Sequence, residues 1–283
     1  MIEKQPARAG AAMWNGTIGT YWVNRQDSFD AVLAPVGDAA IARAGVKSGD
    51  RVIDVGCGCG TTTIELARKT GPRGHVLGID ISKPMLSRAA ARIPPGRSIE
   101  FVEADATTYA FRAASYDVLF SRVGAMFFPD PVPAFTNMRR ALRPGGRISL
   151  ACIRTAQENP YLTVPLAAAQ KHVPPRPRPG PEDPGLFSFA NEERVRRILG
   201  AAGFVSIALE AFDAELDIAG GRGLDAAVET SIELGPTGSL LVGQPQDTRA
   251  AAAASVRETL TPYLRGTGVW LRGSFWIVTA SNP

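Results

Sequence analysis

Apolar and polar residues alternate in two different periods along the middle of the chain. Five short apolar runs alternate with stretches of helical spacing around residues 61–70, 82–93 and 131–142. The runs are RVIDV, HVLGID, IEFVEAD, YDVLFS and GRISLAC, and they lie between residues 50 and 152. Strands that alternate with amphipathic helices are typical of β-α-β units. The pattern therefore predicts an α/β protein with a parallel sheet.

The pattern changes on both sides of this region. Residues 13–44 combine aromatic side chains with helical spacing, which predicts helices ahead of the sheet. Residues 155–186 include the stretch HVPPRPRPGPEDPG, which is incompatible with a regular helix or a central strand and predicts an insertion over the sheet. Regular structure returns in this order: the helix NEERVRRILGAAGF, the strand VSIALEAFDAELDI, a helical region ending near Leu264, and the strand VWLRGSFWIVTA.

Composition excludes several classes of protein. The chain has 283 residues, of which 45% are hydrophobic and 20% charged, as expected for a globular protein. Its 31 Lys and Arg are scattered among 27 Asp and Glu, so nucleic acid is not indicated as a partner. We expect no membrane span, because no apolar run reaches roughly 20 residues. We expect a cytoplasmic location, because MIEKQPARAG lacks the apolar segment of a signal peptide. The expected oligomeric state is a monomer or homodimer.

Residues 52–60, VIDVGCGCG, place a glycine turn directly after a predicted strand. Such a turn brings bare backbone amides and the start of a helix close to a ligand. The dinucleotide fingerprint G-x-G-x-x-G is not met, because Gly56, Gly58 and Gly60 alternate and Thr61 follows. In addition, Asp54 would repel a pyrophosphate and attract a cationic group. An NAD-dependent oxidoreductase therefore remains only a less favoured alternative.

The three cysteines do not have the spacing of a metal site. Cys57 and Cys59 are separated by one glycine, and Cys152 ends another predicted strand. The only histidines are His75 and His172, whereas a structural zinc site takes four ligands in recognisable pairs. We expect no metal and interpret the two loop cysteines as small residues that fill a tight turn.

Asp54 and the glycines form an ordered set with Asp80, at the end of the next predicted strand, and Asp105, after the third. With VLGIDIS, FVEADATT, YDVLFSR and ALRPGGRISL, this set resembles the class I S-adenosylmethionine-dependent methyltransferases over about residues 45–152. The resemblance implies a doubly wound, mostly parallel, seven-stranded Rossmann-like sheet with a reversed last strand. It adds N-terminal helices and a cap insertion to that sheet.

The same resemblance implies S-adenosylmethionine as the cofactor and S-adenosylhomocysteine as its product. Asp54 would hold the amino group, Asp80 the ribose hydroxyls and Asp105 the adenine. The full set of implied cofactor-binding residues is Asp54, Gly56, Cys57, Gly58, Asp80, Ile81, Met85, Asp105, Ala106, Ser121, Arg122, Val123 and Trp22.

The segment WNGTIGTYWV is similar to helices of the ubiquinone and menaquinone biosynthesis group, which close over the cofactor. Trp14, Tyr21 and Trp22 are therefore the lid candidates. The expected division of the chain is a helical lid at residues 1–44, a cofactor-binding core at 45–154, a substrate-cap insertion at 155–190 and the C-terminal part of the core sheet at 191–283.

Missing motifs narrow the acceptor. Residues 121–124 read SRVG, not the Asp-Pro-Pro-Tyr type of the amine methyltransferases of DNA and RNA, and they hold no cysteine for methylation of C5 of a base. The cysteine set of arsenic methyltransferases is also unmatched. The remaining function is methyl transfer to O, N or C of a small, partly apolar molecule; the alternative is a cofactor-binding regulatory homologue without turnover.

The catalytic residues are not determined by the sequence. Methyl transfer is an in-line displacement, so holding a nucleophile in line and excluding water can supply much of the catalysis, and a general base is optional. The candidates on the substrate side are Tyr161, His172 and Arg122.

Overall fold

The computed structural model describes residues 12–174, 180, 182–233 and 235–283. Within them the strands are β1 (Arg51–Val55), β2 (His75–Asp80), β3 (Ile99–Glu103), β4 (Tyr116–Arg122), β5 (Leu142–Ile153), β6 (Val205–Asp217), β7 (Leu264–Arg265) and β8 (Gly268–Ser281). They form one sheet in the order β3-β2-β1-β4-β5-β8-β6, with the two-residue β7 paired to β8 outside this path.

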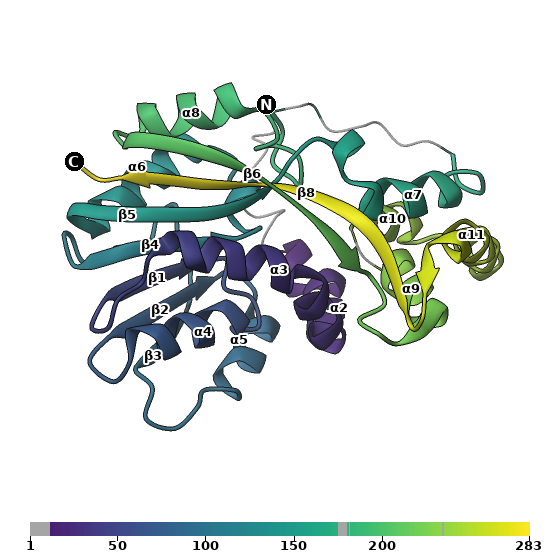
Figure 1. Ribbon diagram of the computed structural model, residues 1–283, viewed down its shortest axis with the longest axis horizontal. Helices are drawn as coiled ribbons and strands as arrows, with labels where there is room; N and C mark the ends of the chain where they lie inside the picture. Colours follow the sequence, from purple (N-terminus) through teal and green to yellow (C-terminus); the bar gives the residue numbers. More distant parts are fainter. Residues whose placement is uncertain (1–11, 175–179, 181, 234) are drawn as a thin grey trace.

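Every strand on this path except β8 points the same way, because β8 pairs antiparallel with both β5 and β6. The expected mostly parallel sheet with a reversed last strand is therefore confirmed. The helices on its faces are α3 (Gln26–Ala44), α4 (Thr61–Thr70), α5 (Lys83–Ala90), α6 (Pro131–Ala141) and α8 (Glu192–Ala201). In Figure 1, α3, α4 and α5 cover one face, and α6 and α8 cover the other.

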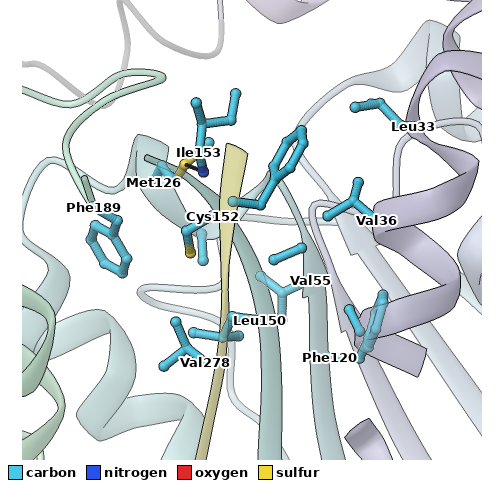
Figure 2. Packing of buried hydrophobic residues seen from close by; sticks show 14 of the residues in the cluster. Leu33, Val36, Val55, Phe120, Met126, Leu150, Cys152, Ile153, Phe189 and Val278 are labelled. Atoms are coloured by element: carbon cyan, nitrogen blue, oxygen red, sulfur yellow. Dashed lines mark hydrogen bonds between the residues drawn. The ribbon is translucent and has the colours of Figure 1, made fainter. Parts of the chain in front are cut away.

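The core lies between these layers and is continuous across the sheet. Figure 2 shows Leu33 and Val36 of α3 on one side of the central strands and Phe189 on the other. Phe120 of β4 and Val36 are fully buried. Strands buried on both faces read as continuous apolar runs, which is why four of the five runs were recognisable in the sequence; the remaining one, β3, is a partly exposed edge strand.

A second group of helices lies at one end of the sheet. It consists of α7 (Pro160–Ala169), α9 (Gly223–Glu233), α10 (Gly235–Leu241) and α11 (Gln246–Leu260), which pack on one another. The long strands β6 and β8 extend beyond the rest of the sheet to reach this group (Figure 1). The cap therefore contains residues from 155–190 and also from the C-terminal region; the division into four parts stays a prediction.

The N-terminal helix α2 (Thr17–Asn24) contacts α3 and α5. Short 3₁₀ helices occur at η1 (Ala125–Phe127), η2 (Ala156–Glu158) and η3 (Thr261–Tyr263). Ser82 stands at the N-cap of α5, but its hydroxyl donates to the Trp14 carbonyl at 2.8 Å instead of capping the helix. Over the described part of the chain, no helix has the length and apolar character required to cross a membrane.

Candidate functional site

Three acidic residues meet at the carboxyl edge of neighbouring strands. Asp54 is the penultimate residue of β1, Asp80 ends β2, and Asp105 follows β3 by two residues. Because β3, β2 and β1 are adjacent and parallel, these side chains share one edge of the sheet. Open α/β sheets bind their ligands at this edge.

The glycine turn after β1 keeps its backbone bare where a ligand can approach. Gly56 and Gly58 have φ of 67° and 54°, the left-handed region that glycine adopts without strain. A Cβ on Gly58 would lie 2.8 Å from Met85 Cε, and one on Gly56 would lie 3.0 Å from Gly124 Cα. The turn therefore has no room for larger residues.

The two cysteines of the turn point inward. Cys57 and Cys59 are both buried and free of disulfides. Burial raises the pKa of the Cys57 thiol well above its usual value and that of Cys59 to about 12, so neither is a thiolate at neutral pH. The Cys57 side chain therefore does not offer a thiolate to a ligand.

Asp54 is fully buried, and only one of its carboxylate oxygens has a partner. Thr62 Oγ1 and Thr63 Oγ1 donate to Oδ2 at 2.8 and 2.6 Å, while Oδ1 accepts no hydrogen bond from the described residues. Burial raises the pKa of Asp54 to about 6, against the hydrogen bonds from the two threonines and the positive charge of Arg122. A buried carboxylate oxygen without a donor fits the cationic amino group of S-adenosylmethionine.

Asp80 connects the glycine turn to the second strand. Its Oδ2 accepts a hydrogen bond from the Gly58 amide at 2.8 Å, and its Oδ1 accepts one from the Ser82 amide at 2.9 Å. Burial raises the pKa of Asp80, and these backbone donors oppose that effect. Each oxygen keeps further lone pairs, which can accept hydrogen bonds from a pair of ribose hydroxyls.

The adenine-side candidates lie on the same edge. Asp105 Oδ1 accepts from the Thr107 amide at 2.8 Å, and Asn137 Nδ2 donates to the Ala106 carbonyl at 3.0 Å. On the other side, Asn15 Nδ2 donates to the Ile81 carbonyl at 2.7 Å, so the N-terminal segment lies over the start of α5. Met85 is buried in α5, and its methyl group faces Gly58.

Arg122 forms an ion pair with Asp30 of α3. Arg122 Nη2 donates to Asp30 Oδ1 at 2.8 Å, and the two side chains are only 12% and 18% exposed. Thr61 Oγ1 and Gln26 Nε2 donate to the other Asp30 oxygen at 2.5 and 3.0 Å. Burial acts to raise the pKa of Asp30, but Arg122 and these donors outweigh burial and lower it. Arg122 is thus engaged in joining β4 to α3, which does not favour the catalytic role considered from the sequence.

The end of β4 lies against the glycine turn. Ser121 Oγ donates to the Val55 carbonyl at 2.7 Å and accepts from the Ala125 amide at 3.1 Å, so this hydroxyl joins β4 to β1. Val123 has φ of 61°, a strained conformation for a β-branched residue. Gly124, which follows it, is the residue in contact with Gly56.

A cavity of about 110 Å³ adjoins this point. It is lined by Trp22, Phe29, Val32, Leu33, Val123, Ile153, Tyr161, Leu162, Pro165, Leu186, Ile218, Thr230, Ser231, Gly235, Pro236 and Thr237. The lining combines the N-terminal helices, the ends of β4 and β5, and the cap. The rings of Trp22 and Phe29 have centroids 4.5 Å apart.

The structure treats the substrate-side candidates differently. Tyr161 lines the cavity, and burial raises the pKa of its hydroxyl so that it remains protonated. His172 is exposed, forms a hydrogen bond with Ser255 Oγ at 2.7 Å and does not line the cavity. A larger hollow of about 340 Å³ lies beside the β7–β8 hairpin, but none of its lining residues belongs to β1, β2 or β4.

Several residues of this site were not identified from the sequence. Thr62 and Thr63, which hold Asp54, had a usable signal: they follow the glycine turn at the start of a helix, and threonine is an ordinary donor to a nearby acid. Asp30, Gln26 and Asn15 had no comparable signal, because their partners outside the Gln26–Asp30 pair are distant in the sequence.

Comparison with known proteins agrees with this geometry. A family model described as a methyltransferase domain matches residues 52–146. The demethylmenaquinone methyltransferase of Staphylococcus aureus (strain JH9) is 30% identical over 178 residues, which cover 59% of this chain and 73% of that protein.

Three solved structures of two proteins share the fold. Phosphoethanolamine N-methyltransferase 2 of Haemonchus contortus, in complex with S-adenosyl-L-methionine, has a TM-score of 0.58 and 19% identity, with 96% of this chain and 60% of that chain covered. In a second structure of that enzyme, this chain spans about half of the length, 52%. The [4+2]-cyclase SpnF has a TM-score of 0.54 and 17% identity, with 94% of this chain and 95% of that chain covered. Because one neighbour is a cyclase, the fold alone does not determine the reaction.

The identity to the Staphylococcus protein shows that this chain belongs to the class I S-adenosylmethionine-dependent methyltransferases. Its activity is accordingly that of a methyltransferase, and its cofactor is S-adenosylmethionine. The two alternatives from the sequence, an NAD-dependent oxidoreductase and a regulatory homologue without turnover, are not favoured.

Proposed function

We propose that the protein transfers a methyl group from S-adenosylmethionine to O, N or C of a small, partly apolar molecule bound in the 110 Å³ cavity. One observation supports this proposal above the others. Val123 is part of the cavity lining, and the next residue, Gly124, contacts Gly56 in the glycine turn. The cofactor loop and the acceptor cavity therefore meet at Val123–Gly124.

On the cofactor side, we assign Asp54 to the amino group and Asp80 to the ribose hydroxyls. The unpaired Oδ1 of Asp54 and the remaining lone pairs of Asp80 support these roles. Ile81 and Met85 would pack on the adenine, and Asp105 with the Ala106 backbone would contact its edge. Ser121 and Arg122 would act by positioning, since their side chains already have partners in β1 and α3.

When bound, the cofactor supplies a methyl group on a positively charged sulfur, which becomes neutral once an acceptor atom takes the methyl. The residues of the chain hold the acceptor in line with that group and exclude water. Trp22, Phe29 and the cap residues enclose the cavity, so the acceptor is desolvated where it reacts. None of the lining residues is a carboxylate, an imidazole or an amine, so this arrangement acts by position and not by a charged base.

The names of two relatives suggest two classes of acceptor, one apolar and one charged. The Staphylococcus relative is named for demethylmenaquinone, and the Haemonchus enzyme for phosphoethanolamine. The uncharged cavity lining of this chain supports an apolar acceptor over a charged one. We also propose a reducing compartment such as the cytoplasm, which the free, buried Cys57, Cys59 and Cys152 support.

The test uses methyl-labelled S-adenosylmethionine and a fractionated extract of small metabolites. We expect label to appear in a small, apolar product, and less of that product with Asp80→Ala when the cofactor is below saturation. Calorimetric binding of the cofactor without any labelled product, in every fraction, would instead favour the regulatory homologue. Label in nucleic acid or protein fractions alone would contradict the proposed acceptor class.

A further inference from the structure

Three residues of the cap that carry hydroxyl groups line the cavity. Thr230 and Ser231 of α9 are each 9% exposed, and Thr237 of α10 is 2% exposed. Among the described residues, no side-chain hydrogen bond connects any of them to the rest of the protein.

Two threonines in other helices, Thr136 and Thr163, form side-chain hydrogen bonds within their own helix. Thr136 Oγ1 donates to the Val132 carbonyl at 2.8 Å, and Thr163 Oγ1 donates to the Asn159 carbonyl at 3.3 Å. Donation to the carbonyl one turn earlier is the common way for a helical threonine to satisfy its hydroxyl. Unlike Asp54 Oδ1, none of these three hydroxyl oxygens is fully enclosed without a partner, so each is accessible from the cavity and can bind a polar ligand group there.

The charge around the cavity restricts that ligand group. None of the cavity-lining residues carries a charge, and the only titratable side chain among them is the protonated Tyr161. Charged residues close to the lining positions in the chain have partners of opposite charge. Arg122 pairs with Asp30 at 2.8 Å, Arg154 pairs with Glu158, and Arg25 pairs with Glu233 at 3.0 Å and with Glu229. A charged ligand would lose its hydration without gaining an opposite charge.

The volume restricts the size of the ligand. A cavity of roughly 150 Å³ with an apolar lining holds one benzene molecule. At about 110 Å³, this cavity accepts a group of about one small ring, and larger parts of a ligand would have to extend beyond it. The apolar surfaces of Trp22, Phe29 and Leu33 contact such a ring.

We propose that the cavity selects an uncharged molecule of about one ring in size that carries an oxygen atom, and that Thr230, Ser231 and Thr237 bind this oxygen. The identification of this molecule as the methyl acceptor rests on the proposed function. Its recognition by the three hydroxyls does not.

The binding test uses four probes with a common ring: phenol, toluene, benzoate and benzylammonium. Each is titrated into the full-length protein in the presence of S-adenosylhomocysteine, with calorimetry or ligand-observed NMR as the readout. We expect phenol to bind about three- to tenfold more tightly than toluene, as one net hydrogen bond provides. We expect no measurable binding of benzoate or benzylammonium. Binding of either ion as tight as that of phenol would overturn the proposal.

Thr237→Val removes one hydroxyl at nearly constant shape. It should lower phenol affinity about three- to tenfold and leave toluene affinity unchanged, while the unfolding midpoint does not fall, because no internal hydrogen bond is lost. Thr230→Val is the second variant and should behave in the same way. Thr136→Val is the matched control: it loses an internal hydrogen bond outside the cavity, so its unfolding midpoint should fall while its phenol affinity stays the same.

Equal affinities for phenol and toluene, unaffected by either cap variant, would mean that water alone satisfies the hydroxyls and would overturn the proposal. Failure of the proposed function is a separate result. In that case the protein would still bind phenol more tightly than toluene, but it would not transfer label from S-adenosylmethionine to any acceptor.

Discussion

The substitution Asp54→Asn tests two properties of the Asp54 carboxylate. This carboxylate should lower the stability of the protein without its cofactor, and it should bind the cationic amino group of the cofactor. Burial raises the pKa of Asp54 from 3.8 to about 6 in the folded protein. The folded protein therefore binds this proton more tightly than the unfolded chain does. As the pH rises from 4 to 6, ionisation of Asp54 lowers the free energy of unfolding by about 1.4 kcal/mol per pH unit. Above pH 6 this loss of stability, the ionisation penalty, stays constant at about 3 kcal/mol.

Asparagine carries no charge at any of these pH values, so this penalty disappears. Thr62 and Thr63 can still donate to its oxygen, while its amide nitrogen occupies the place of Oδ1 without an acceptor, at a cost of about 1–2 kcal/mol at every pH. Asp54→Asn should therefore be about 1–2 kcal/mol more stable than the native protein at pH 7.5. This advantage should decrease by about 3 kcal/mol between pH 7 and pH 4.

Urea unfolding of both proteins at unit steps from pH 4 to pH 8 measures this difference. Calorimetry at pH 7.5 should show that the variant binds S-adenosylmethionine about 10- to 100-fold more weakly, because one charge-assisted hydrogen bond is lost. The reasoning would be refuted by a stability difference that does not change with pH. Unchanged affinity for the cofactor would refute the assignment of Asp54 to its amino group.

Four further substitutions probe the remaining assignments. Asp80→Ala should keep the fold and weaken cofactor binding at least tenfold in calorimetry, since two ribose hydroxyls lose their acceptor; unchanged affinity would contradict that role. Gly58→Ala should lower the free energy of unfolding by about 1–2 kcal/mol in urea, because φ is 54° and the new Cβ approaches Met85, whereas an unchanged midpoint would show that the turn adapts. Asp30→Asn should cost about 2–3 kcal/mol in the same assay by leaving the positive charge of Arg122 without its partner, and an effect below 0.5 kcal/mol would mean that solvent replaces the pair. His172→Ala should change neither turnover nor stability beyond about 0.5 kcal/mol, and a large loss of turnover would restore it as a catalytic candidate.

Local patterns determined most of the sheet and the cofactor side. Apolar runs predicted β1, β2, β4 and β5 because these strands are largely buried on both faces. The partly exposed edge strand β3 was predicted from its place in the alternation of strands and helices. The last strand and its neighbour were also visible from the sequence, although the two-residue β7 was not. Asp54, Asp80 and the alternating glycines were recognisable because they lie at the end of their strands or directly after them, so a short stretch of chain contains both the element and its candidate chemistry.

The substrate side was decided by contacts between distant parts of the chain. Asp30 and Arg122 are 92 residues apart, and only the packing of α3 on the sheet makes them an ion pair. Tyr161 and His172 were equivalent candidates in the sequence, yet one faces the cavity and the other faces Ser255. Thr230, Ser231 and Thr237 had no recognisable pattern, because a helical threonine normally satisfies its own hydroxyl, and only the tertiary structure shows that these residues do not. Sequence periodicity predicts which side of a helix or strand is buried. Only the tertiary structure determines which residues each buried side chain contacts.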